Sequence, residues 1–154
     1  MRIYLPATAG DLRGDGLDLD WAHAVTAALR AELADEDDEG LEMTATLAAA
    51  DDSVRRIASD ASVPRRVVVV ADLPDALVQV PEVLGEEQLP SAVEVVGPVR
   101  WTDVVALLVD EPAAADDVRA AAAGDDGALD RSAERDLLWY DVVELDDLRA
   151  ELGG

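Results

Sequence analysis

Residues 64–75, PRRVVVVADLPD, constrain the fold most strongly, because four consecutive valines follow two arginines. A strand with one face in water alternates apolar and polar residues, whereas a strand covered on both faces is continuously apolar. The run from Val67 to Val70 does not alternate, so we expect a strand in the middle of a sheet. Val68 and Val70 should be buried on one face, and Val67 and Val69 on the other.

The remaining apolar patterns predict further strands and helices. Strands are expected at residues 2–6, 66–71, 92–96, 104–109 and 137–143, with an extended segment over 17–25. The strands at 92–96 and 104–109 are close enough in sequence to be hairpin partners, and 137–143 is apolar enough to be buried on both faces. Helices are expected at residues 26–33, 39–60, 112–123, 128–135 and 145–152.

The clearest helix covers residues 39–60. Its apolar residues are spaced three and four apart, which is typical of one buried stripe. The predicted stripe consists of Met43, Leu47, Ala50, Val54, Ile57 and Ala61.

Strands and helices interleave along the whole sequence, which indicates the α/β class. The sequence predicts a single domain over residues 1–152, with helices packed on a mixed sheet of about five or six strands. Its length of 154 residues suits one domain with its own core. Residues 73–90 carry three prolines and little periodicity, so we expect a loop that is the most mobile segment.

The acidity of the chain bears on its partners. It carries 35 acidic and 12 basic residues, for a net charge of −23, which disfavours binding to nucleic acid and to anionic membranes. There is no cysteine, no apolar run long enough to cross a bilayer and no secretory leader, so we expect a cytoplasmic protein. A GC-rich genome accounts most simply for the absence of Lys, Asn and Phe; adaptation to high salt and mimicry of nucleic acid are the alternatives.

Three predicted strands run into acidic residues: Asp72, then Asp110 with Glu111, then Asp141. If these strands are parallel, the carboxylates meet at one edge of the sheet and are candidates for a Mg²⁺ site. Asp72, Asp110 and Asp141 are then the candidate catalytic residues of a phosphoryl-transfer or hydrolase enzyme. The favoured interpretation is helix capping or a solvated turn, because no phosphate-binding glycine loop and no Lys accompany them.

Other side chains give weaker signals. His23 is the only histidine and has no nucleophile or second metal ligand near it in sequence, so we expect a packed or surface residue. The paired arginines Arg55-Arg56 and Arg65-Arg66 are expected to pair with carboxylates of the same chain. The five aromatic rings are expected to fill the core; they are Tyr4, Trp21, Trp101, Trp139 and Tyr140.

Several segments resemble an actinobacterial family of small proteins described only as a domain of unknown function. The segments are MRIYLPAT at residues 1–8, AHAVTAALR at 22–30, PRRVVVVADLPD at 64–75, VRWTDVVALLVDE at 99–111 and LLWYDVVELDDL at 137–148. The resemblance covers nearly the whole chain and fits the GC-rich interpretation. It implies no activity, cofactor or catalytic residue.

A complete core, a large charge and no assembled chemistry favour a non-enzymatic protein that interacts with another protein and needs no cofactor. The Mg²⁺-dependent enzyme is the alternative. Strand direction separates the two hypotheses, because one antiparallel strand moves its acid to the opposite edge of the sheet.

Overall fold

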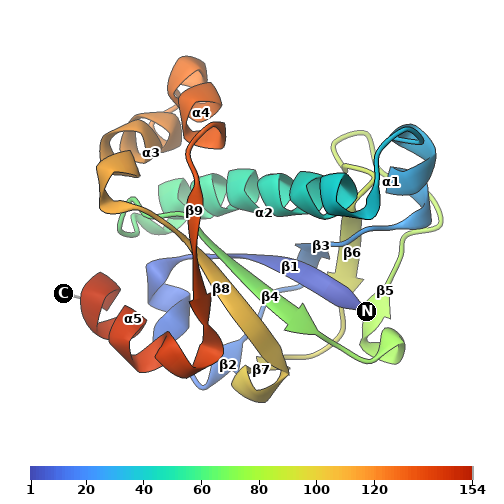
Figure 1. Ribbon diagram of the computed structural model, residues 1–154, viewed down its shortest axis with the longest axis horizontal. Helices are drawn as coiled ribbons and strands as arrows, with labels where there is room; N and C mark the ends of the chain where they lie inside the picture. The colour runs from blue at the N-terminus through green and yellow to red at the C-terminus, as the bar shows by residue number, and fades with distance from the viewer. Residues whose placement is uncertain (154) are drawn as a thin grey trace.

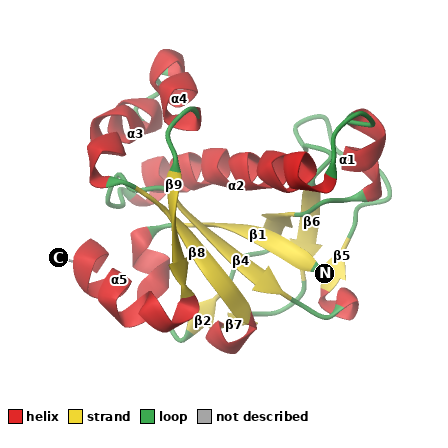
Figure 2. Cartoon of the chain, viewed as in Figure 1, coloured by secondary structure: helices red, strands yellow, loops and turns green. Residues whose placement is uncertain are grey.

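Strands and helices alternate along the chain in the computed structural model, which describes residues 1–153 (Figures 1 and 2). The strands are β1 (Arg2–Ala7), β2 (Gly16–Leu17), β3 (Trp21–His23), β4 (Val67–Asp72), β5 (Val78–Gln79), β6 (Ala92–Val95), β7 (Val99–Arg100), β8 (Val104–Asp110) and β9 (Leu137–Asp141). The α-helices are α1 (Ala27–Glu32), α2 (Asp38–Asp60), α3 (Ala115–Ala122), α4 (Asp126–Ala133) and α5 (Leu145–Gly153). Short 3-10 turns are η1 (Ala9–Arg13), η2 (Asp75–Leu77), η3 (Trp101–Asp103), η4 (Pro112–Ala114) and η5 (Val142–Glu144).

Seven of the strands form one sheet in the order β5-β6-β3-β1-β4-β8-β9, while β2 and β7 pair separately. The α/β class and the single domain are confirmed. The sheet is larger than the expected five or six strands, and every pair in it is antiparallel, so it is not the mixed sheet that we expected. The predicted hairpin of residues 92–96 with 104–109 is wrong, because β3, β1 and β4 lie between β6 and β8.

The valine run forms β4, which lies between β1 and β8 and is buried on both faces, as predicted. Val68 and Val70 face α2, where they pack with Ala45 and Tyr4. Val67 and Val69 belong to the larger cluster on the opposite face, together with the apolar side of α5. One helix therefore crosses each face of the central strands (Figure 1).

The apolar stripe of α2 is correct only toward its C-terminal end. Ala50, Val54 and Ile57 are buried, but Met43 is 56% exposed and Ala61 is an exposed C-cap residue with φ of 51°. In the N-terminal half Leu41 and the small residues Ala45, Ala48 and Ala49 are buried instead. Because the buried side chains there are mostly alanines, the helix lies close to the sheet and turns Met43 away from it.

Strand β9 differs most from its prediction. It pairs only with β8 and ends the sheet, so residues 137–143 are not buried on both faces. Trp139 is 61% exposed and Leu138 is 38% exposed. Of the five aromatic rings, only Tyr4 is fully in the core, and Trp21 is also exposed. The core is filled by Val, Leu, Ile and Ala, which pack closely without large rings.

The segment 73–90 is not entirely loop. It contains the turn η2 and the short strand β5, which forms the other end of the sheet by pairing with β6. Residues 87–89 of the segment line a cavity together with residues of β3 and α2. No helix among residues 1–153 combines the length and the apolar character that crossing a membrane requires.

Candidate functional site

The antiparallel sheet places Asp110 at the edge opposite to Asp72 and Asp141, because β8 runs antiparallel to both β4 and β9. Ala71 near the end of β4 lies opposite Val104 at the start of β8, so Asp110 at the far end of β8 is at the other edge of the sheet from Asp72. Asp141 lies opposite Ala106, two strands away from Asp72. The parallel arrangement on which the Mg²⁺ hypothesis depended is absent. Within the described residues, no three His, Asp or Glu side chains gather in a way that could hold a metal ion.

Asp110 is instead half of a fully buried ion pair with Arg66, both side chains being 0% exposed. Its Oδ1 lies 2.7 Å from Nη2 of Arg66, and its Oδ2 accepts from Nε at 2.9 Å and from the backbone N–H of Arg66 at 2.7 Å. The guanidinium Nη1 is buried and has no hydrogen-bond partner among residues 1–153. This carboxylate fastens the end of β8 to the start of β4 and is not free for a metal ion.

The other acids named from the sequence also have structural partners. Asp72 pairs with Arg2 at 2.9 Å across β1 and β4, and this hydrogen bond lowers the pKa of Asp72. Glu111 lies 3.3 Å from Arg135. Asp141 caps η5: its Oδ1 accepts from the N–H of Val143, and Glu144 accepts from the N–H of Asp141. Capping was the expected role, and only Asp141 performs it among these acids.

A groove of about 660 Å³ lies on the face of the sheet that α2 crosses. Its floor is the strip of sheet that α2 leaves uncovered, formed by Val70, Ala106, Leu108 and Trp139. Met43 and Leu47 of α2 form one wall, and residues 133–137, which connect α4 to β9, form the other. Met43 and Trp139 line this groove. Both were predicted to be buried and are exposed instead.

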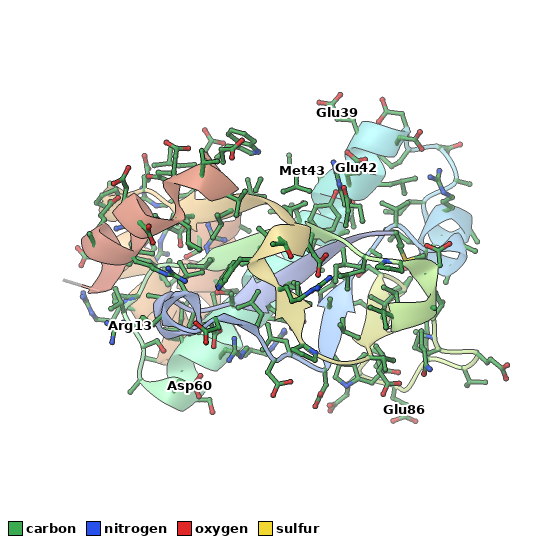
Figure 3. The ribbon with its side chains drawn as sticks, turned by 90° about the horizontal axis from the view of Figure 1, so that it is seen from below. Arg13, Glu39, Glu42, Met43, Asp60 and Glu86 are labelled. Atoms are coloured by element: carbon green, nitrogen blue, oxygen red, sulfur yellow. The ribbon has the colours of Figure 1, made fainter. Side chains whose placement is uncertain are left out.

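The rim of the groove is acidic. Its carboxylates are Glu39, Glu42, Glu134 and Asp136, all exposed and none in an ion pair within residues 1–153. Figure 3 shows Glu39, Glu42 and Met43 projecting from the N-terminal half of α2. The two arginines at the groove do not neutralise these acids, because Arg2 pairs with Asp72 and Arg135 with Asp117 and Glu111. Burial, and then the charge of Glu42, raise the pKa of Tyr4 beneath them.

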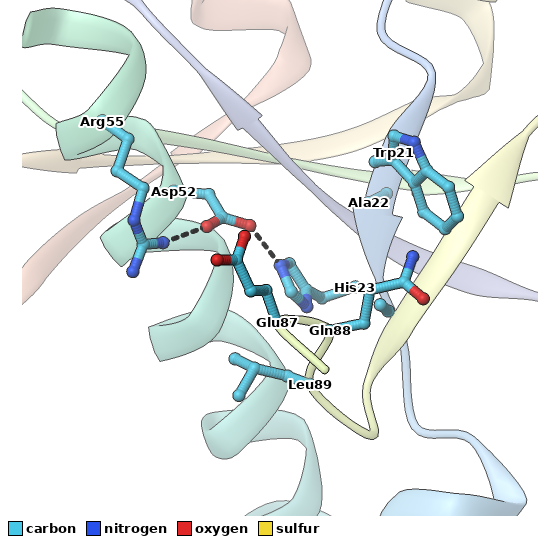
Figure 4. Close-up of a pocket in the computed structure, with 9 residues that line it drawn as sticks. Trp21, Ala22, His23, Asp52, Arg55, Glu87, Gln88 and Leu89 are labelled. Atoms are coloured by element: carbon cyan, nitrogen blue, oxygen red, sulfur yellow. Dashed lines mark hydrogen bonds and ion pairs between the residues drawn. The ribbon is translucent and has the colours of Figure 1, made fainter. Parts of the chain in front are cut away.

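A second cavity, of about 640 Å³, lies at the other end of the sheet around His23 (Figure 4). His23 is 4% exposed; its Nδ1 lies 2.7 Å from Oγ of Ser91, and its Nε2 lies 2.6 Å from Oδ2 of Asp52. Asp52 also accepts a hydrogen bond from Arg55. Burial alone would raise the pKa of Asp52, but the hydrogen bond from His23 and the charge of Arg55 hold it below its usual value.

The hydroxyl, imidazole and carboxylate thus stand in a row, but they do not form an accessible hydrolytic triad. Ser91 is 1% exposed and does not line the cavity, so a substrate there cannot reach its oxygen. His23 is packed, one of the two alternatives that the sequence left open, and it hydrogen-bonds to Asp52, which lines the cavity. Sequence reasoning missed the row because its members lie 29 and 68 residues from His23.

The paired arginines bond within the chain, as predicted. Arg55 contacts Asp52, Arg56 contacts Asp11, and Arg65 lies 3.4 Å from Glu151, in addition to the buried pair of Arg66.

Comparisons with known proteins locate the chain in a family. Neither the curated proteins nor the solved structures include a match to it. A family model matches residues 1–148, which is nearly the whole chain. The resemblance to a family of unknown function is therefore confirmed. The chain belongs to DUF6912, a family of unknown function.

Proposed function

We propose that this chain is a non-enzymatic, cytoplasmic protein-interaction domain, of the actinobacterial origin that its resemblance implies. Its docking surface is the groove between α2 and the connection from α4 to β9. The observation that carries the proposal is an apolar strip of sheet left uncovered beside α2 and bordered by four unpaired carboxylates.

The exposed side chains at the groove are of the kind that anchor protein interfaces. Trp139 is 61% exposed and Met43 is 56% exposed, on opposite sides of the same apolar floor. Trp is over-represented among the residues that supply most interface energy, and Met adapts its shape to a partner. A sheet face is ordinarily covered by a packed layer, and α2 supplies that layer only over part of this face.

The partner that fits is a basic amphipathic helix of another protein. An apolar stripe on such a helix would cover the floor beside α2, and lysines or arginines flanking the stripe would meet Glu39, Glu42, Glu134 and Asp136. A second copy of this chain fits poorly, because it would bring the same acids face to face at a net charge of −23 per copy.

The Mg²⁺-dependent enzyme gains no support from the geometry. Its three carboxylates lie at different places in the sheet, and Asp110 is held by Arg66. Nucleic acid and membranes remain unfavourable partners on charge alone.

A pair of synthetic helices tests the proposal. The first peptide has a leucine stripe flanked by Arg and Lys, and the second has the same stripe flanked by Glu. Binding is followed by backbone amide chemical shifts. Trp139→Ala is compared with Trp21→Ala, since both tryptophans are exposed but only Trp139 lines the groove.

We expect the basic peptide to bind and to shift residues of α2, β8 and β9. Trp139→Ala should weaken it about tenfold or more, the range of an interface anchor, while Trp21→Ala leaves it unchanged. Shifts confined to the outer edge of β9, equal binding of the acidic peptide, or equal effects of the two variants would overturn the groove assignment. Self-association in sedimentation experiments would replace the proposed partner by a second copy.

A further inference from the structure

The cavity around His23 is separate from the groove and has a different chemistry. Its lining combines the apolar and aromatic residues Trp21 and Leu89 with the charged residues Asp52, Arg55 and Glu87. Its volume of about 640 Å³ is within the range of small-molecule sites, roughly 300–1,000 Å³. Packing in the core accounts for His23 and Ser91, but it does not account for Trp21, which is 43% exposed and lines the same cavity as two carboxylates.

The charges in the cavity do not balance. Asp52 and Arg55 form an ion pair, which leaves Glu87 without a hydrogen-bond or ion-pair partner among the described residues. Figure 4 shows the carboxylates of Asp52 and Glu87 directed into the same part of the cavity. The site therefore lacks one positive charge, and the net charge of −23 further attracts cations.

The aromatic wall adds a second preference for the same ligand. The face of a tryptophan ring attracts a cation that lies within about 6 Å of its centre. Trp21 and Glu87 line the same cavity, so an ammonium group bound there has both a carboxylate and an aromatic ring available to it. Leu89 and Ala92 would cover an apolar group attached to it.

The positions of the charged groups are set by the fold. His23 is held on β3 through Ser91, and it fixes Asp52 of α2 at 2.6 Å. Thr26 donates to the carbonyl oxygen of Pro90 at 2.5 Å, which fastens the end of the loop that carries Glu87 and Leu89. Three long-range hydrogen bonds thus join the strand, the helix and the loop around one space.

We propose that this cavity binds a small organic amine: an ammonium group carried on an aromatic or branched apolar group. Glu87 supplies the unpaired charge, Trp21 the aromatic face, and Asp52 a carboxylate oriented by His23. The amine site and the docking groove are independent proposals, so an experiment that refutes one does not bear on the other.

Phenethylamine and 3-phenylpropionate test it as a matched pair, because they share the ring and chain length and carry opposite charges. Binding is measured by calorimetry, and the imidazole resonances of His23 report whether the ligand is in the cavity. Glu87→Gln is compared with Glu86→Gln, since Glu86 is the adjacent acid that does not line the cavity.

We expect phenethylamine to bind saturably and to shift the His23 resonances, and 3-phenylpropionate to do neither. Glu87→Gln should weaken binding about two- to fivefold, the range of an exposed ion pair, with Glu86→Gln unchanged. Failure of the amine to bind, equal binding of the acid, or equal loss in both variants overturns the proposal. An unshifted His23 with measurable binding does so as well, since it places the amine elsewhere.

Discussion

Replacing Asp110 by alanine tests whether this buried acid at the end of β8 stabilises the fold. The change removes the carboxylate that accepts from the guanidinium of Arg66 and from the Arg66 backbone N–H. Both side chains are 0% exposed, so water cannot take the place of the carboxylate without entering the core. The guanidinium, whose Nη1 already has no partner, would be left buried and unpaired.

Breaking a buried ion pair by removing one partner costs about 3–5 kcal/mol. That is a large part of the roughly 5–15 kcal/mol that stabilises a typical domain. For a chain near 150 residues, 1 kcal/mol shifts the melting temperature by roughly 2–4 °C, so we expect Asp110→Ala to melt roughly 6–20 °C lower. Urea unfolding, followed by circular dichroism, measures the free energy directly.

Two controls separate charge burial from general damage. Asp146→Ala removes a carboxylate that is 92% exposed and pairs with Arg149, so its cost should be below about 1 kcal/mol. The double variant Arg66→Met with Asp110→Leu should be more stable than Asp110→Ala, because it removes both charges together. A cost for Asp110→Ala as small as that of Asp146→Ala would refute the reasoning.

Three further predictions concern solution conditions. Burial alone would raise the pKa values of Asp11 and Asp52, but hydrogen bonds from Arg56 and His23 hold both below their usual value. The stability that these two carboxylates add to the folded protein is therefore complete above about pH 4, the pKa of unfolded Asp, and is lost as the pH falls below it. Burial raises the pKa of Asp51, so the Asp51→Asn variant should melt at a higher temperature than the wild type at pH 7. The net charge of −23 predicts a melting temperature that rises between about 0.01 and 0.1 M salt, where the screening length falls from ~30 to ~10 Å, and then levels off; a steep rise into molar salt would indicate salt adaptation instead. Calorimetric titration with Mg²⁺ should give no specific binding heat, and a heat that Asp72→Asn abolishes would restore the metal hypothesis.

The strands and helices could be predicted well because their signals are local. The four valines of β4 lie between two strands and are buried on both faces. Thr26 caps α1 by accepting from the N–H of Leu29, at the start of the helix predicted over residues 26–33. Thr8 and Asp11 form a capping box at the start of η1.

Strand order and direction depend on pairing between distant segments, which apolar patterns do not encode. The parallel arrangement that would gather all three acids was therefore conditional, and the antiparallel β8 places Asp110 at the edge opposite to Asp72 and Asp141. An apolar run such as residues 137–141 is equally compatible with a central strand and with an edge strand. Trp139 is exposed because β9 is the last strand of the sheet, and the residues of β9 alone do not indicate that position.

The two cavities were beyond sequence reasoning for the same reason. The groove exists because α2 covers part of a sheet face, and its acids come from α2 and from the connection to β9. The row from Ser91 through His23 to Asp52 joins a loop, a strand and a helix. The lone histidine was expected to be either packed or on the surface, and its sequence context gave no indication of its partners.

Site-specific cross-linking in living cells shows whether the groove binds a basic helix of another protein. A photoreactive amino acid replaces Met43 in the groove or, as the control, Val83, which is 85% exposed and lies outside it. We expect one major adduct at Met43, formed with another protein through a basic peptide whose apolar residues have helical spacing, and no such adduct at Val83. The same adducts at both positions, an acidic cross-linked peptide, or a cross-link between two copies of this chain would contradict it.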